Sequence, residues 1–149
     1  MELSLRPAGP EDIDLLYRWA NDPVTRQNGF HTEQISYEEH RAWYAGVMQD
    51  DSTLLYICLE DHKPVGQIRL RVEGGQALIS YSVDPENRGR GVGTRLLGLA
   101  EERLKREYPR AELLWGEVKY ENVPSLRAFE KNGYAREDRE NCVVYRKEI

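Results

Sequence analysis

The sequence predicts an α/β (α+β) domain in which helices flank a mixed β-sheet. Runs of alternating or continuous apolar residues that are typical of strands are interspersed with segments of helical periodicity. Three of the strand candidates follow one another with short, turn-prone connections between them, which predicts an antiparallel meander. A single apolar stripe from Val92 to Tyr108 marks the longest helix.

The first third of the chain predicts one strand and two helices. Residues 3–6 alternate as a strand, and the segment Gly9-Pro10-Glu11-Asp12 then opens a helix with proline and acidic residues in its first turn. Its apolar residues at helical spacing are Ile13, Leu16, Tyr17 and Ala20. After the turn-prone residues 21–23, the chain stays polar to Ile35. Ser36 and Glu39 have the spacing of a capping box, so a second helix is expected from there to about residue 49. One face of it would carry His40, Trp43, Tyr44 and Val47.

The middle of the chain predicts the meander. Its strand candidates are residues 53–59, 64–72 and 77–83. The connections are short, and the second contains Gly74 and Gly75, a pair suited to the positive φ angles of a hairpin turn.

The last third continues with the long helix, a strand at residues 112–118, a short helix at 122–132 that ends at Gly133, and a final strand at 142–146. The apolar stripe of the long helix consists of Val92, Leu96, Leu97, Ala100, Leu104 and Tyr108. No repeat or Gly/Ser/Pro-rich linker divides the sequence, so residues 1–149 are expected to form a single domain.

Composition argues against several classes of function. A net charge of −5 gives little support to binding of nucleic acid, which needs a concentrated basic face. The apolar runs are too short to span a bilayer and the start of the chain lacks a signal-like segment, so we expect a cytoplasmic protein with no membrane partner. Two cysteines and three scattered histidines predict neither a disulfide framework nor a metal site.

A glycine-rich segment lies between the third meander strand and the long helix. It reads Arg88-Gly89-Arg90-Gly91-Val92-Gly93-Thr94. Glycines let the backbone approach a ligand closely, and the first N–H groups of the following helix point toward an anion, so the segment suits a pyrophosphate. The two arginines would add charge-assisted contacts. The spacing differs from that of a P-loop and of a dinucleotide fold; the other interpretation is a flexible turn with solvated arginines.

This segment resembles the acyl-CoA signature of the GNAT acetyltransferase superfamily, with Arg88-x-x-Gly91-x-Gly93 as the matching residues. A later region, Asn122-x-x-Ser125 and Phe129-Glu130-Lys131-x-Gly133-Tyr134, is similar to the superfamily's pantetheine-flanking helix. The resemblance extends over essentially the whole chain. It implies a mostly antiparallel central sheet flanked by about four helices. The strand that ends at Val83 and the strand at residues 112–118 would splay apart to admit acetyl-CoA.

The resemblance also implies roles for individual residues. Val83 would offer backbone hydrogen bonds to the pantetheine or thioester, and the N–H groups from Gly89 to Thr94 would hold the pyrophosphate. The full set of expected cofactor-binding residues is Val83, Arg88, Gly89, Arg90, Gly91, Val92, Gly93, Thr94, Asn122 and Phe129.

Acetyl transfer to an amine requires a proton for the departing thiolate and a neutral amine. Many relatives carry a tyrosine acid where this chain has Phe129, so the acid is assigned to Ser125, which matches the serine that some relatives use. The alternative is that Ser125 only bonds the backbone at the start of its helix. The strand 77–83 offers no carboxylate as a base; Glu117, His40, and Tyr81 acting through water stay as candidates.

The resemblance places the acceptor against the first two helices and predicts a primary amine. The segment from Trp19 to His40 is similar to two branches, one acting on nucleotide-linked amino sugars and one on the N-termini of ribosomal proteins, and we favour the sugar. Two other functions stay open, namely a non-catalytic acyl-CoA-binding domain and a protein that binds ATP or NAD on the glycine-rich segment. A homodimer also stays open.

Overall fold

The computed structural model describes residues 1–149, which fold around one seven-stranded sheet of strand order β1-β2-β3-β4-β5-β7-β6. All neighbouring strands pair antiparallel except β4 and β5, which are parallel. The strands are β1 (Leu3–Pro7), β2 (Thr53–Glu60), β3 (Lys63–Glu73), β4 (Gln76–Val83), β5 (Leu113–Val118), β6 (Ala135–Asp138) and β7 (Val143–Glu148). The helices are α1 (Ile13–Ala20), α2 (Pro23–Asn28), α3 (Tyr37–Gln49), α4 (Val92–Glu107) and α5 (Val123–Lys131), with 3₁₀ turns at Pro10–Asp12 and Pro85–Asn87. None of these helices has the length and apolar character needed to cross a membrane.

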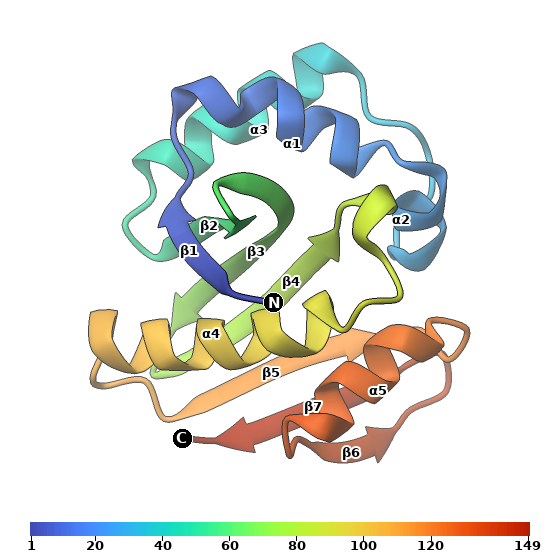
Figure 1. The fold of residues 1–149 in the computed structure, drawn as a ribbon. Coiled ribbons are helices and arrows are strands. Elements are labelled where there is room, and N and C mark those ends of the chain that lie inside the picture. Colours follow the sequence, from blue (N-terminus) through green and yellow to red (C-terminus); the bar gives the residue numbers. More distant parts are fainter.

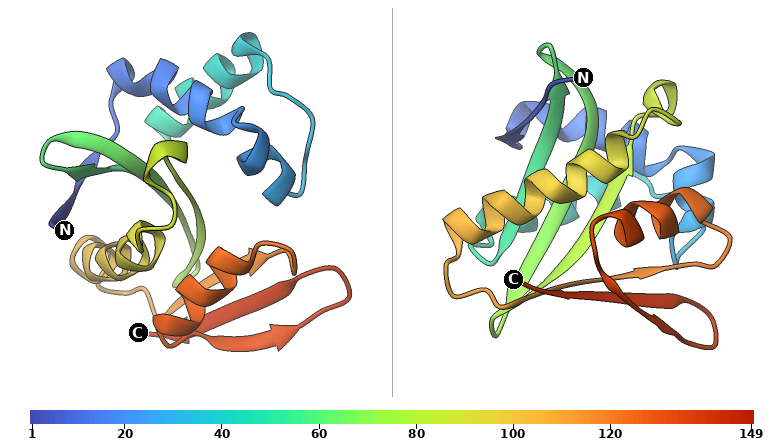
Figure 2. Two further views of the ribbon diagram at one scale, coloured as in Figure 1. Left: turned by 45° about the vertical axis from the view of Figure 1, so that its right-hand side comes forward. Right: turned by 60° about the horizontal axis from the view of Figure 1, so that its bottom comes forward.

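Helices cover both faces of the meander, as the different views in Figures 1 and 2 show, with α1 and α3 on one side and α4 on the other. Each strand contributes side chains to both faces of the sheet, because successive side chains of a strand point to opposite faces. Leu55 and Ile57 of β2 pack with α1 and α3, whereas Tyr56 and Cys58 belong to the core on the α4 side. The larger core, which also includes residues of α5, β5 and β7, lies on the α4 side.

The predicted fold class is confirmed, and the predicted elements correspond closely to the observed ones. The side chain of Ser36 accepts a hydrogen bond from the Glu39 N–H at the start of α3. Gly74 and Gly75 both have positive φ in the β3–β4 turn, and Gly133 has a φ of 82° just after α5.

Two elements were missed, and one helix face differs from expectation. Helix α2 lacks an apolar face and none of its residues is buried, so the periodicity of residues 21–35 gave no signal for it. Strand β6 is exposed at every position and therefore shows no apolar alternation. In α3, His40 and Tyr44 are buried as the predicted face requires, but Trp43 is 41% exposed.

Candidate active site

Strands β4 and β5 pair only at their beginnings, where Gln76–Leu78 lie beside Leu113–Trp115. Beyond that point β4 continues to Val83 and β5 to Val118 without pairing to each other, while β5 stays paired with β7 along its whole length. The sheet is therefore open between the C-terminal halves of β4 and β5. This is the splayed arrangement that the sequence resemblance implied.

The glycine-rich segment lies between β4 and α4, next to that opening. Gly89 and Gly91 have φ angles of 77° and 82°, a left-handed conformation that glycine adopts readily, and Gly91 is the residue that precedes the first turn of α4. A Cβ atom added at either glycine would meet no atom within 4 Å. The segment thus presents open space in front of the positive end of a 16-residue helix, which suits an anionic group.

Gly93 has a different role from the other two glycines. A Cβ atom at Gly93 would lie only 3.2 Å from the ring of Tyr81. Its lack of a side chain thus lets α4 pack closely against β4, in addition to the cofactor role predicted for its backbone. Thr94, also a predicted cofactor residue, accepts a hydrogen bond at its carbonyl oxygen from the Asn132 side chain of the segment after α5.

Arg88 and Arg90 both bond carboxylates within the protein. The guanidinium of Arg88 donates to Asp22 at the start of α2, and that of Arg90 donates to Glu60 at the end of β2 at 2.8 and 2.9 Å. Burial alone would raise the pKa of Asp22, but the bonds from Arg88 and Thr25 outweigh it and leave that pKa below its ordinary value. These pairs hold the loop in place from two sides. Direct contact of either arginine with a pyrophosphate stays a prediction.

The structure brings together Tyr81 of β4 and Ser125 of α5, two residues that sequence analysis considered for separate roles. The Tyr81 hydroxyl donates to Ser125 Oγ at 2.9 Å. Ser125 is only 6% exposed, and burial raises the pKa of Tyr81 even though the bond to Ser125 opposes the rise. Since a serine hydroxyl can accept one hydrogen bond and still donate its own proton, Ser125 keeps a proton to give.

The capping role considered for Ser125 falls to Asn122. Asn122 is the residue that caps α5, and its side chain accepts from the Ser125 N–H at 3.4 Å. The Ser125 hydroxyl therefore serves the bond from Tyr81, and its backbone alone takes part in the cap. A contact between Asn122 and the cofactor stays a prediction.

Phe129 lies in the core between α5 and the sheet. Its ring stacks on that of Tyr145 at a centroid distance of 5.1 Å and meets Tyr134 edge-on at 4.9 Å. Close packing against β5 depends on Gly116, because a Cβ atom there would come within 2.8 Å of the ring. Phe129 is 2% exposed, so the structure supports packing as its role, and cofactor contact stays a prediction.

The candidate bases occupy very different surroundings. His40 is buried with its Nε2 3.0 Å from the Ile13 carbonyl oxygen, and burial lowers its pKa. It packs against aromatic rings on the α1 and α3 side, which fits a structural histidine. Glu117 on β5 is exposed and lies 3.9 Å from the Cys142 thiol. Neither is joined to the Tyr81–Ser125 pair by a hydrogen bond.

Comparison with known proteins supplies independent findings. A family model described as the acetyltransferase (GNAT) family matches residues 13–134. A comparison with curated proteins found no match. Among solved structures, a domain from Methanocaldococcus jannaschii superposes with a TM-score of 0.86 at 20% identity, over 99% of each chain.

Two of the similar structures are acetyltransferases in complex with coenzyme A. An aminoglycoside acetyltransferase in complex with coenzyme A and kanamycin has a TM-score of 0.85 at 18% identity, over 99% of this chain and 95% of that chain. A ribosomal-protein alpha-N-acetyltransferase in complex with coenzyme A has a TM-score of 0.85 at 18% identity, over 99% and 94%. At these identities the likeness shows a shared fold.

Proposed function

The chain belongs to the acetyltransferase (GNAT) family, and we propose that it transfers the acetyl group of acetyl-CoA to a primary amine, with a nucleotide-linked amino sugar as the preferred acceptor. The observation that carries the proposal is the glycine-rich loop at the start of α4 beside the opening between β4 and β5. Family membership favours an enzyme over the non-catalytic domain and the ATP- or NAD-binding protein considered above.

Acetyl-CoA would lie with its pyrophosphate against the N–H groups from Gly89 to Thr94 and its pantetheine arm in the opening beside Val83. The positive φ of Gly89 and Gly91 and the empty space above them support the first contact. The unpaired C-terminal halves of β4 and β5 support the contact with the pantetheine arm, because the backbone groups that face the opening make no hydrogen bonds between the two strands. The carboxylate partners of Arg88 and Arg90 make loop positioning their better supported role.

Ser125 would act as the acid for the departing CoA thiolate. Its hydroxyl accepts from Tyr81 and so can give its own proton to the sulfur as the C–S bond breaks. The Tyr81 hydroxyl stabilises the serine oxygen as this proton leaves, and the proton lost by the acetylated nitrogen restores the serine hydroxyl, so that acetyl-CoA and the amine give the amide and free CoA. Tyr81 belongs to β4, and Ser125 belongs to α5, the helix that follows β5. The pair therefore bridges the two sides of the opening, where the thioester would lie.

The acceptor proposal rests on the chemistry of the α1 to α3 region. Aromatic and polar side chains gather there, with Trp43 exposed, and such groups suit a sugar or base. Two proteins of the same fold act on an aminoglycoside and on a ribosomal protein, which supports an amine as the acceptor and keeps protein N-termini as the alternative.

We expect acceptor choice to appear as CoA release in matched panels of nucleotide-linked amino sugars and N-terminal peptides, each with saturating acetyl-CoA. The sugar panel should give the higher kcat/KM, with CoA release dependent on the added amine. Turnover confined to the peptides would contradict the sugar and leave the acetyltransferase standing. An absence of amine-dependent CoA release with both panels would contradict the transfer itself.

A further inference from the structure

A pocket lies between α3 and the sheet, on the face opposite α4. Its volume is about 390 Å³, and five of its ten lining residues are exposed. We call it the α3 pocket; its lining residues are Ala42, Trp43, Gly46, Val47, Asp50, Thr53, Arg69, Arg71, Leu78 and Ser80. None of them belongs to the glycine-rich loop or to the Tyr81–Ser125 pair.

The α3 pocket contains two arginines without carboxylate partners. Arg69 and Arg71 lie two residues apart on β3 and so project to the same face of the sheet. Neither takes part in an ion pair, whereas Arg6, Arg88 and Arg90 each bond a carboxylate. In a chain with five more acidic than basic residues, two adjacent unpaired cations on one pocket wall are a local exception to the overall charge.

Arg69 is the more enclosed of the two. Its guanidinium lies 5.1 Å from the centre of the Trp43 ring, and its only side-chain hydrogen bond is a long one of 3.5 Å to Ser80 Oγ. Burial lowers the pKa of Arg69, and the neighbouring charge of Arg71 adds to the effect. A partly buried cation with unused N–H donors is costly unless something supplies acceptors and negative charge.

Asp50 is the one carboxylate in the α3 pocket, and its oxygens already have partners. One oxygen accepts from the backbone and hydroxyl of Ser52, and the other accepts from the Thr53 hydroxyl. Among the lining residues, two arginines lie against this one carboxylate, whose pKa is lowered mainly by its bonds to Ser52 and Thr53, with a smaller contribution from the charge of Arg71. The remaining donors suit phosphate oxygens, which arginine's planar fork can contact in pairs.

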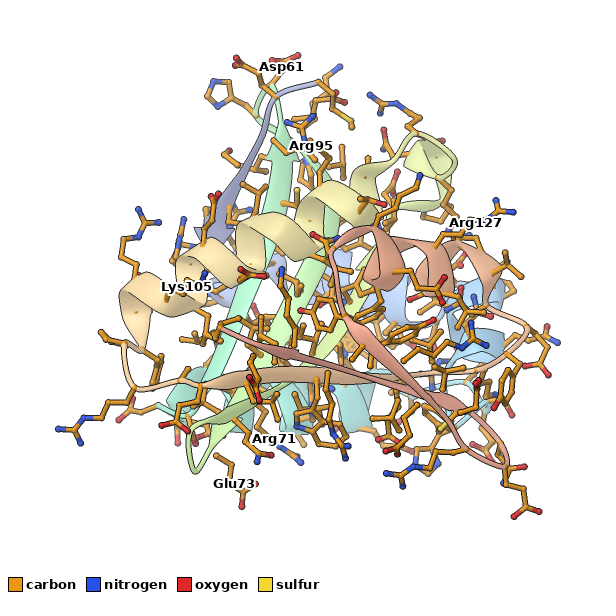
Figure 3. The ribbon with its side chains drawn as sticks, turned by 90° about the horizontal axis from the view of Figure 1, so that it is seen from below. Asp61, Arg71, Glu73, Arg95, Lys105 and Arg127 are labelled. Atoms are coloured by element: carbon orange, nitrogen blue, oxygen red, sulfur yellow. The ribbon has the colours of Figure 1, made fainter.

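A polar row connects this pocket to the end of β4. The strand register places Gln67 beside Ser82, Arg69 beside Ser80 and Arg71 beside Leu78, all on the face that α1 and α3 cover. Ser80 precedes Val83 by three residues, which is about 10 Å along a strand. Figure 3 shows Arg71 near Glu73, at the opposite end of β3 from the Asp61 turn. The row therefore leads along the α1 and α3 face of β4 from the α3 pocket toward the opening between β4 and β5, and the Tyr81–Ser125 pair lies on the other face of the sheet at that opening.

We propose that the α3 pocket binds the diphosphate of a nucleotide-linked acceptor through Arg69 and Arg71. The inference rests on the proposed function and names the contact that would select its substrate class. Ser80, opposite Arg69, lies about 10 Å along the strand from Val83, and Leu78, opposite Arg71, lies about 17 Å from it, so the sugar would extend from the Arg69 side of the diphosphate toward the end of β4. Trp43, which is 41% exposed and lines the pocket, offers its ring for stacking of the base beside the Arg69 guanidinium.

Titration of uridine diphosphate into the protein saturated with CoA tests this contact, because CoA then occupies the cofactor loop. Uridine diphosphate should bind, and uridine, which lacks the phosphates, should bind far more weakly. Arg69→Ala should weaken uridine diphosphate binding by about 10- to 100-fold, the loss expected for charge-assisted hydrogen bonds. The affinity of Arg69→Lys for uridine diphosphate should lie between those of the wild type and Arg69→Ala, because lysine keeps the positive charge but lacks the planar guanidinium that contacts two oxygens at once. Arg106→Ala, which removes an exposed arginine of α4, should leave the affinity for uridine diphosphate unchanged.

In turnover, Arg69→Ala should raise the KM of a nucleotide-linked amino sugar with little change in the KM of acetyl-CoA. Unchanged uridine diphosphate binding in folded Arg69→Ala and Arg69→Lys would overturn the proposal. So would a CoA complex that binds no uridine diphosphate while it acetylates peptide amines, and in that case the acetyltransferase function would stand. Failure of the proposed function itself would appear differently, as a lack of CoA release with every amine.

Discussion

Ser125→Ala is expected to lower kcat by about 10²- to 10⁴-fold while the KM of acetyl-CoA changes little, because the substitution removes the proton intended for the CoA thiolate. Tyr81→Phe should lower kcat less, since the Ser125 proton remains and only the hydrogen bond to its oxygen is lost. Steady-state kinetics with a saturating amine measures both effects.

Asn132→Ala is a suitable control for the Ser125 variant. It removes side-chain hydrogen bonds to the carbonyl oxygens of Thr94 and Ala128, near the site but outside the Tyr81–Ser125 pair. It should lower the melting temperature with a much smaller effect on kcat. A normal kcat in folded Ser125→Ala would show that the Tyr81–Ser125 bond serves packing alone.

Gly91→Val is expected to abolish tight binding of acetyl-CoA. The valine would place a β-branched side chain where the pyrophosphate must approach, at a φ of 82° that costs a non-glycine residue about 1–3 kcal/mol.

Acetyl-CoA should stabilise the wild-type fold by about 2.7 kcal/mol at a hundredfold excess over its Kd, and ATP and NAD should not. The variant should lose this stabilisation in a thermal-shift measurement and show a steep rise in the KM of acetyl-CoA.

Gly74→Val provides a matched control, because Gly74 also has positive φ and open surroundings but lies in the β3–β4 turn. It should lower the melting temperature through the same backbone strain and leave acetyl-CoA binding intact. Wild-type cofactor affinity in folded Gly91→Val would mean that the loop has another purpose. Stabilisation of the wild type by ATP or NAD alone would point to a nucleotide-binding protein.

Most of the fold could be predicted because its elements carry their own local signals. Helix α4 shows a continuous apolar stripe, and all five of its buried residues belong to that stripe. Helix α2 was missed because the only local indication of it in the sequence is its N-terminal cap. Asp22 accepts from the Thr25 N–H and Pro23 follows it at the first helical position, a combination that could have indicated a short helix.

The candidate site was predictable in composition but less so in its contacts. A sharp turn in the strand-to-helix connection could be predicted from its glycines, but their spacing does not distinguish Gly89 and Gly91, which adopt positive φ, from Gly93, which does not. The carboxylates that hold Arg88 and Arg90 come from residues 66 and 30 positions away, so no local pattern indicates them. The same holds for Tyr81 and Ser125, which are 44 residues apart and meet only because α5 returns to β4.

A single reaction mixture distinguishes acetyl transfer to an amine from hydrolysis of acetyl-CoA. The protein is incubated with acetyl-CoA labelled in its acetyl group and a nucleotide-linked amino sugar, and the CoA released and the acetyl group transferred are both quantified by mass spectrometry. Acetyl transfer should give equal amounts of free CoA and N-acetylated sugar, both dependent on the protein and the amine. CoA release without an acetylated amine, or no CoA release with any amine supplied, would contradict it.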